Sequence, residues 1–425
     1  MSTIYALATP HGKAGLAVIR VSGPEASAAV TQMAGALPCP RRAGLRRLRD
    51  ERGDVLDEAV VVVFPEGQSY TGETVVELQC HGSPAVVSAI LEELSRRDGL
   101  RPAEAGEFTR RSLLNGRMDL MQVEGLADLL QAETDLQRRQ AWRTFDQGAS
   151  TLVGAWQSRL RRALALTEAG IDFSDQEVPE DLGIEVDAII REVLAEVQIQ
   201  IDRMPAAERL RSGYEVAIVG PPNSGKSTLF NYLGGRDLAM TSHVPGTTRD
   251  VLEVHVDVAG LPVTFLDTAG LRPTSDPLEG MGMERARRRA NAADLRVFLL
   301  NGEEAEPPLP PMDGDIAVMG KADLRTEGGD VSGLTGLGVA PLLDRIAGRL
   351  RPSEPTNGLF NRHRHRHVLH RTVTYLAVVR DRTDMPVELA AEYLWRASAE
   401  LGRLVGAVDS DDLLGDVFRS FCIGK

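Results

Sequence analysis

Hydrophobic residues are spaced differently in successive parts of this 425-residue chain, and the spacing predicts its organisation. Up to about residue 115, short apolar runs over Ala17–Val21, Ala59–Phe64 and Thr74–Leu78 predict strands, and Ala85–Leu94 predicts a helix. From about Met118 to Arg211, apolar residues recur every three or four positions with few turn signals. That second pattern is typical of long amphipathic helices.

Helical spacing returns only after a region of a different kind. The polar, proline-containing stretch Arg351–Gly358 ends that region, and helices are expected again at His367–Val379 and Val387–Val408. We therefore expect a multidomain protein of α/β and α class. Its parts would be an N-terminal α+β domain at 1–117, a helical bundle domain divided between 118–211 and 351–425, and an α/β domain at 212–350 inserted between those two parts.

The inserted region begins with a phosphate-binding motif. An apolar run from Glu215 leads into Gly220–Ser227, which fits the pattern G-x-x-x-x-G-K-[ST], and a helical pattern follows to Leu233. The glycines let backbone N–H groups face phosphate oxygens, Lys226 reaches the β- and γ-phosphates, and the hydroxyl of Ser227 can bind Mg²⁺. The motif predicts that the chain binds a nucleoside triphosphate.

Further elements, in the expected order along the chain, favour GTP. An apolar run ends in Asp267–Gly270, as expected of a Mg²⁺-side carboxylate and a γ-phosphate-sensing glycine, and Pro245–Asp250 supplies the hydroxyls of a switch segment. Gly320–Asp323 resembles the guanine-reading N-K-x-D element, in which Asp323 would accept hydrogen bonds from the base, and Val331–Gly336 stands where the last element belongs. The first residue of N-K-x-D is glycine here, so one contact to the base is missing.

Composition limits the partners. The net charge of −13 argues against a broad basic surface, so RNA would have to bind locally or together with another subunit. No apolar run approaches about 20 residues, and no signal segment is recognisable, so we expect a cytoplasmic protein with no membrane contact. Three cysteines without metal-binding spacing suit a reducing compartment. Only four of the 48 basic residues are lysines, and Lys226, Lys321 and the final Lys425 are three of them.

Five segments outside the insertion resemble one family. They are Ala8–Gly23, Ser69–Glu73, Val76–Gly82, Ala105–Thr109 and the terminal Phe421–Lys425, FCIGK. With the inserted motifs they resemble the MnmE (TrmE) tRNA modification GTPases over nearly the whole chain. The resemblance implies a homodimer with a tetrahydrofolate-binding and dimerisation domain at 1–117. It also implies a heterotetramer with a flavin-containing partner, MnmG or GidA. Together they would add an aminomethyl or carboxymethylaminomethyl group to carbon 5 of the wobble uridine of certain tRNAs.

The resemblance also implies two cation sites. Mg²⁺ would be bound by the hydroxyls of Ser227 and Thr248. The residues that match the family's potassium site are Asn223, Ser242, Val244 and Thr247. Potassium would place positive charge where other GTPases use an arginine finger, and dimerisation of the GTPase domains would activate hydrolysis.

Catalysis is assigned by the same comparison. Leu271 follows Asp267–Gly270, where Ras-like enzymes have a water-orienting Gln, so another group must act. Glu279 matches the family's catalytic glutamate and would act with Asp267; the alternative for Glu279 is a solvated loop carboxylate. The residues expected to contact GTP are Asn223, Ser224, Gly225, Lys226, Ser227, Thr228, Ser242, His243, Val244, Pro245, Gly246, Thr247, Thr248, Asp267, Thr268, Ala269, Gly270, Lys321, Asp323 and Ser332.

Four residues fall on the family's folate positions: Arg20, Glu77, Arg117 and Lys425. The two arginines and Lys425 would pair with the carboxylates of the glutamate tail of a formyl- or methylene-tetrahydrofolate. Glu77 would pair with pterin N–H groups. Arg117 stands where the family is expected to have Lys. The alternative is that these residues form only surface salt bridges.

Other patterns have simpler interpretations. Arg362–His367 alternates Arg and His, and we interpret it as a basic helix start, because interleaved arginines repel a metal ion. Asp187–Glu196 fits the charged face of a helix. Cys422 is either a small buried residue near the ligand or a nucleophile. The alternative function is a regulatory switch GTPase in ribosome or RNA assembly, without modification chemistry; a degenerate folate-binding scaffold is disfavoured by the intact Lys226 and Asp267.

Overall fold

The computed structural model divides the chain into two compact units. The first comprises Met1–Ala127, Ser150–Gln157 and Leu401–Lys425, and the second comprises Asp128–Ala149 and Ser158–Glu400. The structure describes residues 2–146, 148–172, 181–235, 253–267, 284, 287–301, 309–325, 329–351, 358–382, 385–406, 421 and 424.

A six-stranded sheet forms the centre of the first unit, with the strand order β3-β4-β5-β2-β1-β6. The strands are β1 (Thr3–Leu7), β2 (Ala17–Ser22), β3 (Gly44–Arg49), β4 (Val55–Phe64), β5 (Val75–Cys80) and β6 (Leu100–Pro102). Neighbouring strands are antiparallel, apart from the parallel pair of β1 and β6. The three strands predicted from apolar runs are confirmed as β2, the second half of β4, and β5.

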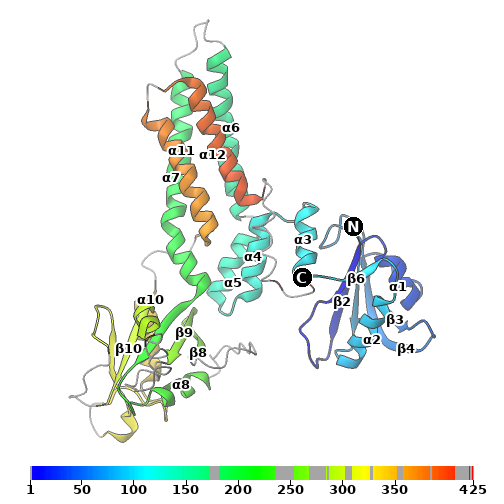
Figure 1. Ribbon diagram of the computed structural model, residues 1–425, viewed down its shortest axis with the longest axis horizontal. Coiled ribbons are helices and arrows are strands. Elements are labelled where there is room, and N and C mark those ends of the chain that lie inside the picture. The colour runs from blue at the N-terminus through cyan, green and yellow to red at the C-terminus, as the bar shows by residue number, and fades with distance from the viewer. Residues whose placement is uncertain are drawn as a thin grey trace. The chain divides into compact units, whose positions relative to one another are not determined.

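Two helices, α1 (Ala26–Ala34) and α2 (Pro84–Ser95), cover one face of this sheet (Figure 1). Because side chains alternate along a strand, Ile19 and Val21 of β2 are buried on the helix side with Ile90 and Leu94 of α2. Arg20, between them, belongs to the opposite face. The helix predicted near residues 85–94 is confirmed as α2.

The end of the chain returns to the first unit. After the sheet come α3 (Glu107–Leu114) and α4 (Leu120–Gln131). Phe421, five residues from the C-terminus, is buried against Val123 and Ala127 of α4. This packing brings the terminal motif close to the domain that carries Arg20.

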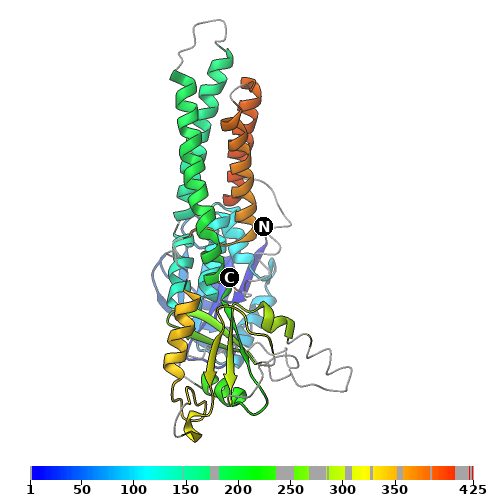
Figure 2. The same cartoon turned by 90° about the vertical axis from the view of Figure 1, so that its left-hand side faces the viewer.

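Long helices make up much of the second unit. They are α5 (Asp135–Phe145), α6 (Gly148–Asp172), α7 (Asp181–Ser212), α11 (His363–Asp381) and α12 (Val387–Val405). Figures 1 and 2 both show α6, α7, α11 and α12 running side by side. Thr134 begins α5 with a capping box, in which its hydroxyl accepts the backbone N–H of Gln137. The helical regions predicted on both sides of the insertion are confirmed.

The basic tract also has the predicted structure. Helix α11 begins at His363, four residues earlier than expected, directly after Arg362. Arg366 pairs with Glu208 of α7 at 2.5 Å, and Arg371 pairs with Glu400 of α12 at 3.0 Å. The arginines therefore attach α11 to its neighbours.

The inserted region folds around a five-stranded sheet with the order β11-β10-β7-β9-β8. Its elements are β7 (Tyr214–Val219), α8 (Lys226–Gly234), β8 (Glu253–Val258), β9 (Leu261–Asp267), β10 (Leu295–Leu300), β11 (Ile316–Met319), the short 3₁₀ helix η1 (Ala322–Leu324) and α10 (Val339–Leu350). All neighbours are parallel except β8 and β9. The expected class, α+β and helical parts with an inserted α/β region, is confirmed. No helix in the described part of the chain is long and apolar enough to cross a membrane.

Candidate nucleotide and folate sites

The phosphate-binding motif lies between β7 and α8, at the carboxyl edge of the parallel strands. Asn223 and Gly225 adopt positive φ angles of 60° and 101°, which turn the loop back so that α8 begins at Lys226. The Lys226 ammonium is buried and donates to the carbonyl oxygens of Gly220 at 2.8 Å and Pro221 at 2.9 Å. The loop thus surrounds its own lysine at a helix N-terminus, the arrangement that binds phosphate.

Asp267 lies beside this loop. It ends β9, and in the parallel pairing with β7 it stands opposite Ile218, two residues before the motif begins. Its side chain is buried. Ser227 belongs to the first turn of α8, so the sheet brings a carboxylate and a hydroxyl, both oxygen ligands that suit Mg²⁺, to one edge.

A hollow of about 210 Å³ opens on the other side of the loop, lined in part by Ser224, Lys321 and Asp323. The side chain of Ser332 is buried, and its hydroxyl donates to Asp323 at 2.5 Å and accepts the backbone N–H groups of Leu334 and Thr335. This bond fixes the orientation of the Asp323 carboxylate. The predicted base-reading residues are therefore brought together in one cavity.

Two leucines form apolar walls at the mouth of this hollow. Leu324 is 75% exposed and Leu334 is 72% exposed, and both line the cavity. Both side chains therefore offer apolar surface to a ligand in the hollow. Sequence reasoning missed both, because a single leucine in a loop has no distinguishing pattern.

Gly320 explains how this chain departs from the N-K-x-D pattern. Its backbone N–H donates to Leu300 at 2.7 Å, and a Cβ atom at this position would come within 2.5 Å of the backbone oxygen of Ser224. The end of β11 therefore packs directly on the phosphate-binding loop. A side chain at residue 320 would require the backbone of either residue 320 or Ser224 to move.

Several expected site residues lie outside the described residues. From the nucleotide and cation sites these are Ser242, His243, Val244, Pro245, Gly246, Thr247, Thr248, Thr268, Ala269, Gly270 and Glu279, and from the C-terminal motif they are Cys422 and Lys425.

The expected folate residues Arg20 and Glu77 meet on the face of the first sheet that lies opposite α1 and α2. They stand opposite each other in the pairing of β2 with β5, and the guanidinium donates to the carboxylate at 2.9 Å. Arg20 also lies over the rings of Tyr70 and Phe108, at 5.2 and 5.7 Å from their centroids. Burial raises the pKa of Tyr70, although its hydrogen bond with Thr109 and the charge of Arg20 oppose the shift. The site combines a charged pair with aromatic surface.

The C-terminal tail reaches the same face. Nη1 of Arg20 lies 3.5 Å from the carbonyl oxygen of Gly424, the long limit of a hydrogen bond. Gly424 has φ 103°, and a Cβ atom there would come within 2.2 Å of the oxygen of Leu7. Arg117 contacts the loop after β4, where its Cγ would lie 3.2 Å from a Cβ at Gly72. The residue before Lys425 is thus placed beside Arg20.

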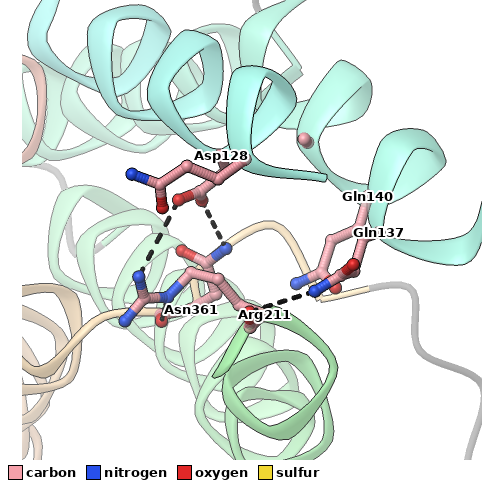
Figure 3. Close-up of a pocket in the computed structure, with 7 residues that line it drawn as sticks. Asp128, Gln137, Gln140, Arg211 and Asn361 are labelled. Carbon is pink, nitrogen blue, oxygen red and sulfur yellow. Dashed lines mark hydrogen bonds and ion pairs between the residues drawn. The ribbon is translucent and has the colours of Figure 1, made fainter. Parts of the chain in front are cut away.

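A polar cluster that the sequence did not predict joins the two ends of the inserted region (Figure 3). Asp128 of α4 accepts a hydrogen bond from Asn361 at 3.0 Å. It also pairs with Arg362 at 2.6 Å. Arg211, at the end of α7, donates from Nε to the carbonyl oxygen of Asn361 at 3.1 Å and accepts from Gln137 at 3.3 Å. The chain therefore leaves and rejoins the helices at one hydrogen-bonded point.

A mainly parallel sheet with this loop, an adjacent carboxylate and a base-side aspartate defines a P-loop GTP-binding protein. The family model described as the GTP-binding protein TrmE N-terminus matches residues 3–117, and the model described as the MnmE helical domain matches residues 120–422. Two relatives from strains of Cereibacter sphaeroides are 53% and 51% identical, and one from Paracoccus denitrificans is 50% identical; each match covers 100% of both chains. All three carry the name tRNA modification GTPase MnmE. The chain belongs to the MnmE family and is a GTPase.

Proposed function

We propose that this GTPase modifies carbon 5 of the wobble uridine of certain tRNAs. It would act with a flavin-containing partner of the MnmG or GidA class and add an aminomethyl or carboxymethylaminomethyl group. One observation carries the proposal: a chain with a phosphate-binding loop also holds an Arg20–Glu77 pair on an aromatic face, with its own C-terminal tail beside it. A GTPase that acts only as a switch has no use for that second site.

In the nucleotide site, Lys226 and Asp267 have distinct roles. Lys226 is held at the loop by two carbonyl oxygens and would transfer its hydrogen bonds to the β- and γ-phosphates. Ser227, Thr248 and Asp267 offer oxygen ligands that fit Mg²⁺, directly or through water. When bound, the metal neutralises charge on the phosphates. Glu279 would orient or activate the attacking water, since Leu271 has no polar group.

A potassium ion is proposed at the other side of the phosphates. Asn223 is exposed in the phosphate-binding loop, where the chain turns with a positive φ angle. The other proposed contacts, Ser242, Val244 and Thr247, belong to the switch segment. Potassium supplies positive charge to the phosphates when bound, and association of two GTPase domains would complete this site.

In the folate site, the described side chains fit an anionic, aromatic ligand. Arg20 has one carboxylate partner and two aromatic neighbours, so a carboxylated ligand with a ring system finds both charge and stacking surface. Arg117 and Lys425 would add cations, and Glu77 would accept hydrogen bonds from pterin N–H groups. A formyl- or methylene-tetrahydrofolate would supply the one-carbon unit.

The proposed assembly is a homodimer formed through residues 1–117 that joins two partner subunits in a heterotetramer. The assignment of 118–211 and 351–425 to one helical domain, and of 212–350 to the GTPase domain, belongs to the same proposal. The enzyme would work in the cytoplasm, where tRNA and reduced folates are available.

The test uses the C-terminal tail. In cells that lack this protein, the parent chain should restore the modified wobble nucleoside, as measured by mass spectrometry of digested tRNA. Deleting Phe421–Lys425 should abolish the nucleoside but leave potassium-stimulated GTP hydrolysis largely intact. Gly424→Ala should act like the deletion, because its Cβ would collide with the backbone oxygen of Leu7. Gly348→Ala, which adds a Cβ in open space on α10, is the matched control.

Binding of the ligand is measured separately. Arg20→Ala should weaken the affinity for a formyl-tetrahydrofolate analogue in calorimetry, because the ligand's carboxylates lose their cation. If the truncated chain restored the nucleoside, the folate assignment would be wrong and a regulatory switch GTPase would become the better interpretation.

A further inference from the structure

The outer strand of the first sheet is unusually basic. Strand β3 and the turn before it contain five arginines, which we call the arginine edge: Arg41, Arg42, Arg46, Arg47 and Arg49. The sequence from Ala26 to Arg49 contains no Asp or Glu, although the whole chain carries a net charge of −13. On the side away from β4, β3 pairs with no other described strand.

Most of this charge is not neutralised by neighbouring acids. Arg46 donates to the backbone oxygens of Ala36 at 2.5 Å and Leu45 at 2.8 Å, and Arg49 donates to the oxygen of Gly53 at 2.7 Å. Carbonyl oxygens satisfy the guanidinium N–H groups but leave its charge in place. Arg41 and Arg42 are exposed and form no ion pair with any described residue.

Of the five arginines of the arginine edge, only Arg47 has an acidic partner among the described residues. It lies 3.2 Å from Glu58 on β4, and the two side chains are 67% and 47% exposed, so the pair is weak. Some arginines elsewhere are enclosed by acids, as Arg111 is by Glu73 and Glu107 at 2.9 Å each. The arginine edge differs from them in offering its charge to solvent.

Two other acids near the arginine edge are bound to other groups. Asp50, in the turn between β3 and β4, accepts the backbone N–H groups of Arg52 at 3.0 Å and Asp54 at 2.8 Å. Asp57 is bound to the ring and the backbone of His81, both at 2.8 Å. These two carboxylates lie close to β3, in the turn after Arg49 and opposite Leu48 on β4, but each is already hydrogen-bonded to groups other than the arginines.

Prevention of edge-to-edge pairing is the simplest alternative for a charged outer strand. One or two charges of either sign achieve that, and Pro or a short strand would serve as well. Five arginines with no acid between residues 26 and 49 exceed the requirement, and they lie in a chain whose overall charge repels polyanions.

We propose that the arginine edge binds the phosphate backbone of the tRNA substrate, an inference that rests on the proposed function. Guanidinium groups form two parallel hydrogen bonds with one phosphate, which suits arginine better than lysine. Strand β3 rises about 3.3 Å per residue, so Arg47 and Arg49, on one face, are roughly 7 Å apart. The strand is about 17 Å long and can follow several phosphates. An acidic protein binds RNA through such a local surface.

The experiment measures how the affinity of the full-length chain for a tRNA transcript depends on salt. The variant Arg41→Gln/Arg42→Gln/Arg47→Gln removes three charges without touching the arginines that hold backbone carbonyls. Fluorescence anisotropy between 50 and 200 mM KCl should show affinity reduced about tenfold or more. The slope of log K against log salt should become shallower by about 2 to 3, since each phosphate contact contributes roughly 0.9.

A second triple variant controls for net charge. Arg161→Gln/Arg345→Gln/Arg349→Gln removes three exposed arginines of α6 and α10 that form no ion pair among the described residues. It should leave affinity and slope close to those of the parent. Both variants should show the circular dichroism spectrum and thermal unfolding of the parent, which shows that they fold; Arg42→Glu and Arg47→Glu as single changes replace the first variant if it does not.

Equal affinity and slope for the first variant and the parent would overturn the proposal, and so would an equal loss in both triple variants. Normal tRNA binding together with aggregation or an altered oligomeric state would assign the arginine edge to contacts between protein chains. In cells, a parent chain that fails to restore the wobble nucleoside refutes the proposed function, whereas the binding result still decides whether the arginine edge contacts RNA.

Discussion

Gly320→Ala is the smallest change that tests how the base side of the nucleotide site is built. The added Cβ would come within 2.5 Å of the backbone oxygen of Ser224, whereas real Cβ atoms essentially never approach closer than 3.0 Å. One backbone must therefore move by at least 0.5 Å. Leu299, the other neighbour at 3.2 Å, is a flexible side chain and can move aside.

The cost falls on the phosphate-binding loop, because the oxygen of Ser224 belongs to it. Forcing one extra carbon into a packed site costs about 1 to 3 kcal/mol. Since about 1.4 kcal/mol corresponds to tenfold, we expect GDP and GTP to bind roughly 5- to 150-fold more weakly. Gly320→Asn should bind no more tightly than Gly320→Ala, although it restores the N-K-x-D pattern.

Titration with fluorescent analogues of GDP and of GTP measures the two dissociation constants. Gly348→Ala in α10 is the control, because its Cβ meets nothing within 4 Å, and it should bind nucleotide as the parent does. If Gly320→Ala bound GDP within twofold of the parent, the loop and the end of β11 would be free to separate. If Gly320→Asn bound nucleotide more tightly than Gly320→Ala, the added contact between the asparagine amide and the base would outweigh the clash with the phosphate-binding loop.

Three further results are expected. Glu279→Ala should bind GTP normally but hydrolyse it at least ~100-fold more slowly in single-turnover assays, the scale of a lost water-orienting group, and near-normal turnover would exclude this glutamate. GTP hydrolysis should be faster in potassium than in sodium at equal ionic strength, and Asn223→Ala should remove the difference; identical parental rates in the two salts would exclude the potassium site. Burial opposes ionisation of Glu107, but hydrogen bonds from Arg101, the Glu104 backbone and Arg111 prevail and lower its pKa to about 2. Since the unfolded pKa is about 4.3, its contribution to stability is present above that pH and is lost as pH falls toward 2. The difference in thermal unfolding midpoint between parent and Glu107→Gln should therefore narrow between about pH 5 and 3, and a constant difference would contradict the assignment.

The strands that were predicted from the sequence have a continuous buried side. β2 and β5 lie inside the sheet and are apolar, so their runs are conspicuous. β3 was missed because it is an outer strand in which only Leu48 is buried, and GLRRLR resembles a polar loop. Helix α1 was missed because its core side is largely alanine.

The nucleotide site was predictable where its residues are adjacent in the sequence. Gly220–Ser227 carries its chemistry in eight consecutive residues, and the structure places it between strand and helix as expected. The contact of Gly320 with Ser224 depends on the packing of β11 against the loop, which no local pattern specifies. Asn361 and Asp128 are 233 positions apart, so their hydrogen bond follows only from the folded chain.

The bond between Arg211 and Asn361 spans 150 positions and closes the inserted region at its base. A segment whose two ends already meet can be cut out and replaced by a few Gly and Ser residues, without stretching or crowding the helices that remain. The same geometry permits circular permutation, in which new termini are opened in a surface loop of the segment and the old ends are kept as a short bridge. The GTPase segment can therefore be inserted or removed as a unit, without a change in the geometry of the helices on either side of it.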